Sequence, residues 1–132
     1  MLFRSRKWAI LDCIGLGFDV EVDLWAMNDG LYLGHDNPES KIEYRFLKDN
    51  ARYLWIHAKN FQAVNFLLMN SKADDLHWFW HEHDKMTLTN KGIPWCYPKN
   101  YSPQGVTVVF DDKPITENVY GICTDYPRQM NK

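Results

Sequence analysis

The sequence predicts an α/β fold built around a mainly parallel sheet. Short apolar segments with strand-like alternation recur along the 132 residues, and helical or irregular stretches separate them. Strands that are separated by crossover segments are typical of parallel pairing. Six Trp, seven Tyr and seven Phe add large rings that bury much area per residue and help a small domain to build a core. We therefore expect a single domain over residues 1–132.

The elements of the first half follow from apolar spacing and from turn residues. Apolar side chains at helical spacing fill the segment before Gly15 and Gly17, which end a helix. Strict alternation predicts the next strand, and the turn signal at residues 28–30 separates it from another. A later helix has Phe61, Val64, Leu67 and Leu68 on one face. In order, we expect a helix over 6–16, strands over 18–25 and 31–35, a helix over 42–50, a strand over 53–58 and a helix over 61–69.

The second half of the chain predicts strands with little room for helices. Residues 88–91 form a short helix or turn, and the connections after residue 97 are too short for full helices. We expect this half of the fold to consist of strands joined by short loops rather than by full helices. Its strands are expected over residues 76–81, 93–97, 106–110 and 120–124.

Composition argues against several classes of function. Fifteen basic and seventeen acidic residues leave a formal charge of -2, whereas a nucleic-acid binder normally has a basic face. The odd set of Cys13, Cys96 and Cys123, without CxxC spacing, is typical of small buried hydrophobes in a reducing compartment. No stretch approaches the roughly 20 apolar residues of a spanning helix, and the basic start leads to no cleavage site. We expect a cytoplasmic protein without stable membrane insertion.

The strand over residues 18–25 carries the clearest chemical signal. Asp19, Glu21 and Asp23 are two residues apart, so they share one face of the strand. Parallel strands are usually covered on both faces, and neighbouring buried carboxylates repel each other unless a positive charge lies between them. A divalent cation is the simplest compensation, because hard cations prefer carboxylate oxygens. The alternative is an edge strand with a solvated acidic face.

Histidines and tryptophans follow several of the expected strands. His35 stands just beyond a strand end, where α/β proteins hold reactive groups, and its titration near neutrality suits proton transfer. His77, His81 and His83 share a face if their strand persists. The segment 81–84 is a candidate metal cluster or, alternatively, a solvated loop. The tryptophans at positions 55, 78, 80 and 95 are expected to fill the core rather than to form a stacking platform for sugars or bases.

The segment from residue 17 to residue 36 resembles the signature of the glycerophosphodiester phosphodiesterase family. It has a Gly, an E-x-D strand with Glu21 and Asp23, a D-G turn at 29–30 and a strand that ends in His35-Asp36. Residues 121–127 look like that family's last strand with its T-D-x-P ending. The middle, at 54–60, 79–81 and 87–92, resembles a compact branch of the same superfamily of phospholipase C-like phosphodiesterases. The resemblance covers about residues 8–127 and implies a shortened or incomplete TIM-type (β/α) barrel. Such a barrel usually needs about 250 residues.

The resemblance also implies a function and a set of site residues. Enzymes of the family hydrolyse phosphodiesters, so the implied activity is metal-dependent hydrolysis of glycerophosphodiester-like or lipid-derived small phosphodiesters. Glu21 and Asp23 would hold the divalent cation, Mg²⁺ or Ca²⁺. His35 would pass a proton to or from a phosphoester oxygen, and Lys59 would stabilise the developing negative charge on phosphate.

Two further histidines belong to the implied site. His57 stands where the family has a glutamate ligand, two residues before Lys59, so both side chains share a face. It is interpreted as a neutral metal ligand or a phosphate hydrogen-bond donor, with an oriented and packed histidine as the alternative. His81 matches the compact branch and is included in the catalytic set.

The chain departs from the family at its start. The family begins with a strand that carries His-Arg-Gly, and its His is the other acid/base; no His precedes His35 in this chain. We expect the first strand to be missing, with residues 4–7 leading straight into a helix. An unpaired strand edge would then invite a homodimer. The alternatives to an active enzyme are a catalytically impaired metal- and phosphate-binding module and a purely structural domain.

Overall fold

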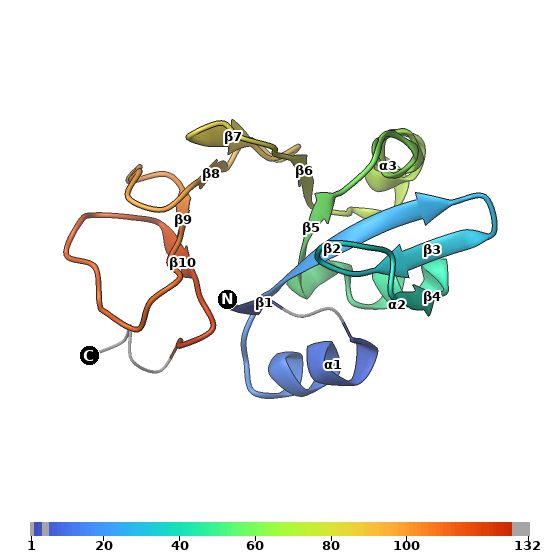
Figure 1. Cartoon of the computed structure of the whole chain (residues 1–132), viewed down its shortest axis with the longest axis horizontal. Helices are drawn as coiled ribbons and strands as arrows, with labels where there is room; N and C mark the ends of the chain where they lie inside the picture. Colours follow the sequence, from blue (N-terminus) through green and yellow to red (C-terminus); the bar gives the residue numbers. More distant parts are fainter. Residues whose placement is uncertain (1, 4–5, 128–132) are drawn as a thin grey trace.

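The part of the chain that the structure describes forms two mixed sheets and three α-helices (Figure 1). The structure is a computed structural model and describes residues 2–3 and 6–127, so Met1, Arg4 and Ser5 of the basic start lie outside the described residues. The elements are β1 (Leu2–Phe3), α1 (Lys7–Gly15), β2 (Val20–Met27), β3 (Gly30–Leu33), β4 (Ser40–Ile42), α2 (Tyr44–Asp49), a 3₁₀ turn (Ala51–Tyr53), β5 (Leu54–Ala58), α3 (Phe61–Asp74), β6 (Trp78–Trp80), β7 (Met86–Leu88), β8 (Pro94–Cys96), β9 (Val106–Val108) and β10 (Gly121–Cys123).

The larger sheet has six strands and the smaller has four. The larger runs in the order β4-β3-β2-β5-β6, with β1 added beside the first residues of β2. The β2–β5 and β5–β6 pairs are parallel, whereas β2, β3 and β4 form antiparallel hairpins. The smaller sheet runs β10-β9-β8-β7, and its β7–β8 pair is antiparallel. Each expected strand is confirmed to within two residues at either end, and β1, β4 and β7 are additional.

The expected TIM-type barrel is wrong. Among the described residues the strands form two separate mixed sheets, with five parallel and three antiparallel strand pairs, rather than one closed barrel. The physical reason is length, since a barrel needs a helical crossover after each strand and rarely fits in fewer than about 200 residues. The segment expected as a helix over 42–50 begins only at Tyr44, and the residues before it form the return strand of a hairpin.

The expectation that the first strand is missing is also wrong. Leu2–Phe3 forms β1, which runs parallel to β2 with Phe3 opposite Glu21. This strand contains no histidine. Farther along, β3 pairs with the same edge of β2, so the edge expected to be open is occupied at both of its ends. The homodimer stays a prediction, but the unpaired strand edge on which it was based is not present in the described residues.

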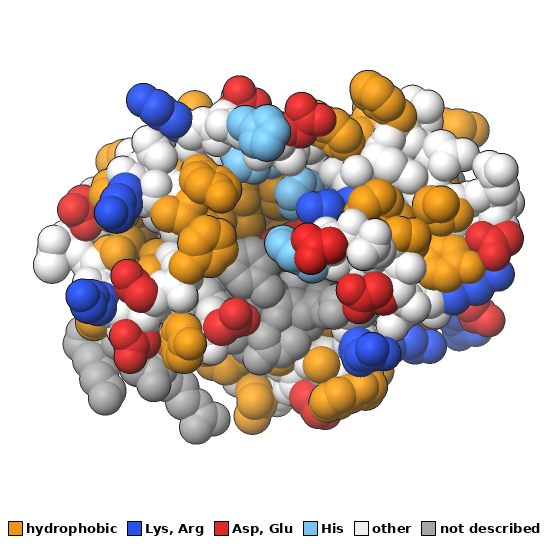
Figure 2. Space-filling view, in the orientation of Figure 1, with side chains coloured by type: hydrophobic (Ala, Val, Ile, Leu, Met, Phe, Trp, Pro, Cys, Tyr) orange, Lys and Arg blue, Asp and Glu red, His pale blue; other side chains and the backbone are white. Residues whose placement is uncertain are grey.

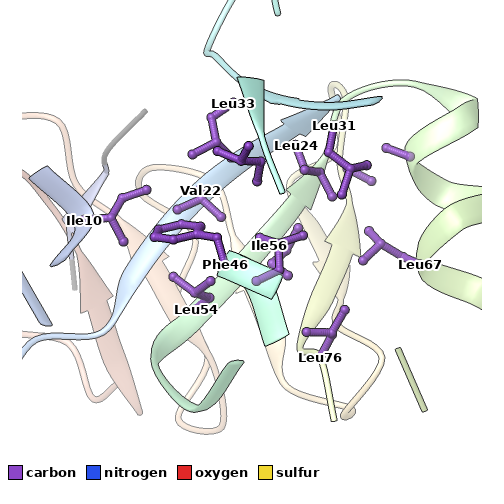
Figure 3. Close-up of a cluster of buried hydrophobic side chains, with 14 of the residues drawn as sticks. Ile10, Val22, Leu24, Leu31, Leu33, Phe46, Leu54, Ile56, Leu67 and Leu76 are labelled. Carbon is purple, nitrogen blue, oxygen red and sulfur yellow. The ribbon is translucent and has the colours of Figure 1, made fainter. Parts of the chain in front are cut away.

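The main core lies between the larger sheet and the helices (Figure 3). Alternate residues of the central strands face outward, where they contact all three helices. Burial of a large apolar side chain stabilises the folded state by roughly 1.5–3 kcal/mol. Figure 1 shows the helices only on this side of the molecule. The residues drawn and labelled are Ile10 from α1, Val22 and Leu24 from β2, Leu31 and Leu33 from β3, Phe46 from α2, Leu54 and Ile56 from β5, Leu67 from α3 and Leu76 before β6.

Half of the predicted face of helix α3 is buried. Leu67 is buried and Val64 packs against the core, whereas Phe61 is 77% exposed and Leu68 is 64% exposed. The other buried residues of the helix are Ala63 and Ser71, whose small size lets the helix lie close to the sheet. Asn60 caps the helix by accepting the Ala63 N–H at 3.0 Å, and its side chain also pairs with the backbone of Ala26.

A second cluster of buried side chains lies on the inner faces of the two sheets. It contains Trp55, Phe79, Trp95, Val106, Val108 and Cys123, which all come from strands. The larger sheet therefore has an apolar outer face and an inner face that continues into the smaller sheet. The three cysteines are buried and free, as expected for small hydrophobes. None of the described helices has the length and apolar character to span a bilayer.

Candidate metal and phosphate site

All six residues predicted for the site line one cavity of about 490 Å³ between the two sheets. The residues are Glu21, Asp23, His35, His57, Lys59 and His81. Figure 2 shows a central hollow with histidines on one side and hydrophobic side chains on the other. The parallel pairing of β2 with β5 sets Asp23 directly beside His57, which explains how residues 34 positions apart meet.

The two carboxylates of β2 are buried at the wall of this cavity. Glu21 is 2% exposed and Asp23 is 8% exposed. Burial, together with the negative charge of Asp23, raises the pKa of Glu21 well above its usual range. Burial also pushes the pKa of Asp23 upward, but hydrogen bonds from His57 and Glu21 and the charge of Lys59 outweigh it and lower that pKa. The solvated acidic edge considered as an alternative is therefore absent at these two positions.

The ring of His57 is oriented toward the carboxylates. Its Nε2 lies 2.9 Å from the carbonyl oxygen of His81, which can only accept, so Nε2 carries a proton and donates. Its Nδ1 lies 3.2 Å from Asp23 Oδ1 and 3.9 Å from Glu21 Oε1. The ring also stacks on Phe79 with centroids 4.9 Å apart. With Nε2 engaged, Nδ1 is the atom through which His57 would contact a ligand, once it gives up the proton that it donates to Asp23.

One buried oxygen of this group lacks a hydrogen bond. Glu21 Oε1 is shielded from solvent and has no partner among the described residues. An unsatisfied buried acceptor costs about 1–3 kcal/mol, so its presence in a native site calls for an explanation. Donor atoms of Glu21, Asp23 and His57 lie within 4.8 Å of one another. Two carboxylate oxygens and one imidazole nitrogen fit a divalent cation, and this donor set admits either Mg²⁺ or Ca²⁺.

His35 reaches the site through a tight loop after β3. Its Nδ1 lies 3.1 Å from Asp23 Oδ2, while the side chain remains 77% exposed. The loop depends on Gly34, whose N–H donates to the Asp23 carbonyl and whose carbonyl accepts from Trp25 Nε1 at 2.7 Å. A Cβ at position 34 would come within 1.8 Å of the Asn37 carbonyl oxygen, so only glycine fits there.

Lys59 and His81 complete the polar part of the cavity. The N–H of Lys59 donates to the Leu24 carbonyl at 2.8 Å, which fixes its backbone beside β2. His81 is more constrained, because its Nε2 donates to the Asp84 carbonyl and its ring stacks on Tyr97 at 5.5 Å. It therefore orients His57 through its own carbonyl and borders the cavity with its ring.

Other predicted acidic and histidine groups lie elsewhere. Asp19 accepts a hydrogen bond from Trp55 Nε1, and Asp29 accepts one from Tyr32 in the β2–β3 hairpin. The segment 81–84 forms no metal-ligand group in the part of the chain that the structure describes, and its residues after His81 are exposed. The solvated-loop interpretation of that segment is the one that fits.

Sequence reasoning missed the apolar wall of the cavity. Trp80, Trp95, Tyr97, Val108 and Phe110 line the side formed mostly by the smaller sheet. Each of these residues lies in or directly after a strand, at the same end as the predicted polar residues. Their position at these strand ends is the feature of the sequence that could have predicted the apolar wall. Asp125 was missed too, and its charge contributes to the raised pKa of Glu21.

Comparisons of the chain with protein-family models, with curated proteins and with solved structures found no match.

Proposed function

We propose that this protein is a metal-dependent phosphodiester hydrolase that acts on glycerophosphodiester-like or lipid-derived small phosphodiesters. The observation that carries the proposal is the buried Oε1 of Glu21, which accepts no hydrogen bond from the described residues and lies beside Asp23 and His57. A group of this kind is stable when a cation supplies the missing positive charge. The same cavity is lined by a lysine and an exposed histidine, which are the groups that a phosphoester needs.

The roles of the side chains follow from their positions. A bound divalent cation supplies Lewis-acid polarisation of a phosphoryl oxygen. Lys59 adds positive charge near the phosphate and stabilises the negative charge that develops during hydrolysis. His35, held by Asp23 and exposed to the cavity, transfers a proton between water and the leaving alcohol oxygen. In the net reaction water adds to phosphorus, one P–O bond breaks, and the alcohol leaves with a proton.

The test is hydrolysis of bis(p-nitrophenyl) phosphate and glycerophosphocholine by the purified full chain with Mg²⁺, Ca²⁺ or Mn²⁺. We expect turnover that a chelator abolishes. Glu21→Gln should abolish the cation-dependent turnover. His35→Ala should lower the rate of hydrolysis by about 10²–10⁴-fold. Asp29→Asn is the matched control, because this acid lies in a hairpin turn away from the cavity. A folded protein that shows no hydrolysis with any of the three cations contradicts the proposal.

A second candidate is a binding module that holds a cation and a phosphoester without turnover. The observation that favours it is β1, which contributes no histidine beside β2. In addition, the Nε2 of His81 is engaged by the Asp84 carbonyl. This candidate predicts that Ca²⁺ and a phosphoester raise the melting temperature together while no product forms. Turnover that disappears in His35→Ala excludes it.

The proposed compartment is the reducing cytoplasm. Its support is that Cys13, Cys96 and Cys123 are all free and buried, and a thiol buried in this way behaves as a small hydrophobe. Burial raises the pKa of Cys96 and raises that of Cys123 strongly, so neither is suited to act as a thiolate nucleophile. Labelling with a thiol reagent under native conditions should therefore be slow at all three.

A further inference from the structure

We propose that Tyr97 and Phe110 form a subsite for a planar aromatic group carried by one alcohol of the phosphoester. We call these two residues the aromatic rim. The inference deepens the proposed function, since it concerns the substrate of the same cavity, and it rests on phosphate binding there.

The size of the cavity leaves room beyond the polar wall. At about 490 Å³ it falls in the range of pockets that enclose a whole small-molecule ligand. A cation and one phosphate group occupy only part of such a volume. The remainder faces Trp95, Val108 and the aromatic rim, so the part of the substrate that extends from the phosphate meets an apolar surface.

The aromatic rim is exposed and yet fixed in position. Tyr97 is 47% exposed and Phe110 is 65% exposed, and their rings meet edge to face with centroids 6.2 Å apart. The N–H of Tyr97 donates to the Lys85 carbonyl at 2.9 Å. The N–H of Val109, next to Phe110, donates to the Cys123 carbonyl at 2.9 Å. At these exposed fractions both rings present apolar area at the cavity that a ligand can cover.

The rim is continuous with the catalytic wall. Tyr97 stacks on the ring of His81, with centroids 5.5 Å apart and planes inclined by 22°. The carbonyl of His81 in turn accepts the hydrogen bond from His57. A ligand whose phosphate lies at Lys59 and the carboxylate group therefore extends directly onto the rim. Figure 2 shows this division, with hydrophobic side chains facing the histidines across the hollow.

A planar ring suits this wall better than a flexible chain. Aromatic side chains outnumber aliphatic ones in it, and ring–ring contacts add attraction beyond the area that they bury. A flexible alkyl chain loses rotational freedom when it binds and gains no such contact. The chemistry of the wall therefore favours an aryl or heteroaryl group.

The test compares three monoesters of equal charge, namely phenyl, n-hexyl and methyl phosphate. Each is titrated into the full chain with saturating Ca²⁺ in a calorimeter. We expect phenyl phosphate to bind about tenfold more tightly than methyl phosphate and several-fold more tightly than n-hexyl phosphate. Tyr97→Leu and Phe110→Leu keep the apolar character of each position but remove the ring. In these variants the advantage of phenyl over n-hexyl phosphate should disappear.

Tyr120→Leu is the matched control, because this ring is 65% exposed and does not line the cavity. Equal affinity for phenyl and n-hexyl phosphate overturns the inference, as does an advantage that survives both leucine variants. Failure of all three esters to bind overturns it together with the proposed function. Turnover of diesters without preference for the aromatic ester overturns the inference alone, whereas selective binding without turnover leaves it standing and removes only catalysis.

Discussion

The two sheets are supported in different ways. The larger sheet is covered by all three described helices, and its outer side chains form a continuous core with them (Figures 1 and 3). The smaller sheet has no helix in the described residues and is held through the inner cluster and through loop hydrogen bonds. The larger sheet contributes the carboxylates and Lys59, and the smaller contributes most of the apolar wall.

This difference teaches where precision is needed. The carboxylates and His57, which we propose to hold a cation, would have to keep their geometry, and side chains on well-packed strands do so. The apolar wall needs only to present surface, and loop-supported strands suffice for that. We therefore expect the larger sheet to dominate stability and the smaller one to tolerate change.

The largest effect should separate the two sheets directly. Val22 in β2 is 0% exposed and Val106 in β9 is 1% exposed, so the same truncation removes the same groups from equally buried sites. Val22→Ala should lower the free energy of unfolding by about 2–3 kcal/mol, and Val106→Ala by about 1–2 kcal/mol, because loops collapse around a cavity more easily than packed helices. Urea denaturation measures both. Equal losses would contradict the comparison.

The next effect concerns the loop that carries His35. Gly34→Ala forces a Cβ against the Asn37 carbonyl, so it should cost about 1–3 kcal/mol and also lower phosphodiester turnover. Gly15→Ala is the control: it meets no atom within 4 Å at the end of α1, and it should leave stability unchanged or slightly raised. Thermal melts and initial rates measure the outcome. A neutral Gly34→Ala would show that the loop is not tightly constrained.

The next prediction concerns the carboxylate group, where the effect of Glu21→Gln on stability should change sign when a cation is added. Without cations, Glu21→Gln should stabilise the fold by about 1 kcal/mol, since it removes a negative charge that burial and the neighbouring Asp23 disfavour. Because the pKa of Glu21 is raised in the folded state, this gain should be present near neutral pH and shrink once both states are protonated in acid. With Ca²⁺ at about 100 times its dissociation constant, the wild type should gain about 2.7 kcal/mol and the variant nothing. Differential scanning fluorimetry with Ca²⁺ or with a chelator measures the melting temperatures of the wild type and the variant. If Ca²⁺ still stabilises Glu21→Gln, Glu21 is not a ligand of the cation.

The last prediction concerns a pH-dependent effect where the two sheets meet. Burial, with the charge of Lys91, lowers the pKa of His77 to about 4, and its Nε2 lies 2.7 Å from Thr89 Oγ1 in the turn that leads to β8. An unfolded histidine has a pKa of about 6.5, so between these values only the unfolded state takes up the proton. The contribution of His77 to the free energy of unfolding is fully present above about pH 6.5, and it decreases as the pH falls toward 4.

His77→Gln removes this titration while it keeps a group that can bond to Thr89. Melting temperatures measured across the same pH range should fall less steeply in the variant than in the wild type. Parallel curves would show that His77 does not hold the junction of the sheets.

Local patterns predicted the elements well and their arrangement poorly. Alternation around Glu21 and Asp23 gave the strand and its two faces, because side-chain direction in a strand is a local property. The hairpins β3–β4 and β7–β8 were missed, because a short apolar segment does not reveal whether its partner runs parallel or antiparallel. The face of α3 was only partly right for a similar reason: Leu67 is buried as predicted, but Ala63 and Ser71 are buried as well because the helix approaches the sheet closely.

The sequence by itself determined which residues carry the chemistry of the candidate site. The E-x-D spacing, the histidine after the next strand and the lysine after β5 all line one cavity. Tertiary structure decided how they meet. The β2–β5 register, the hydrogen bond from His57 to the His81 carbonyl and the unpartnered oxygen of Glu21 depend on strands that are distant in sequence. Periodicity is set by neighbours along the chain, whereas register, burial and hydrogen-bond partners are set by packing across it.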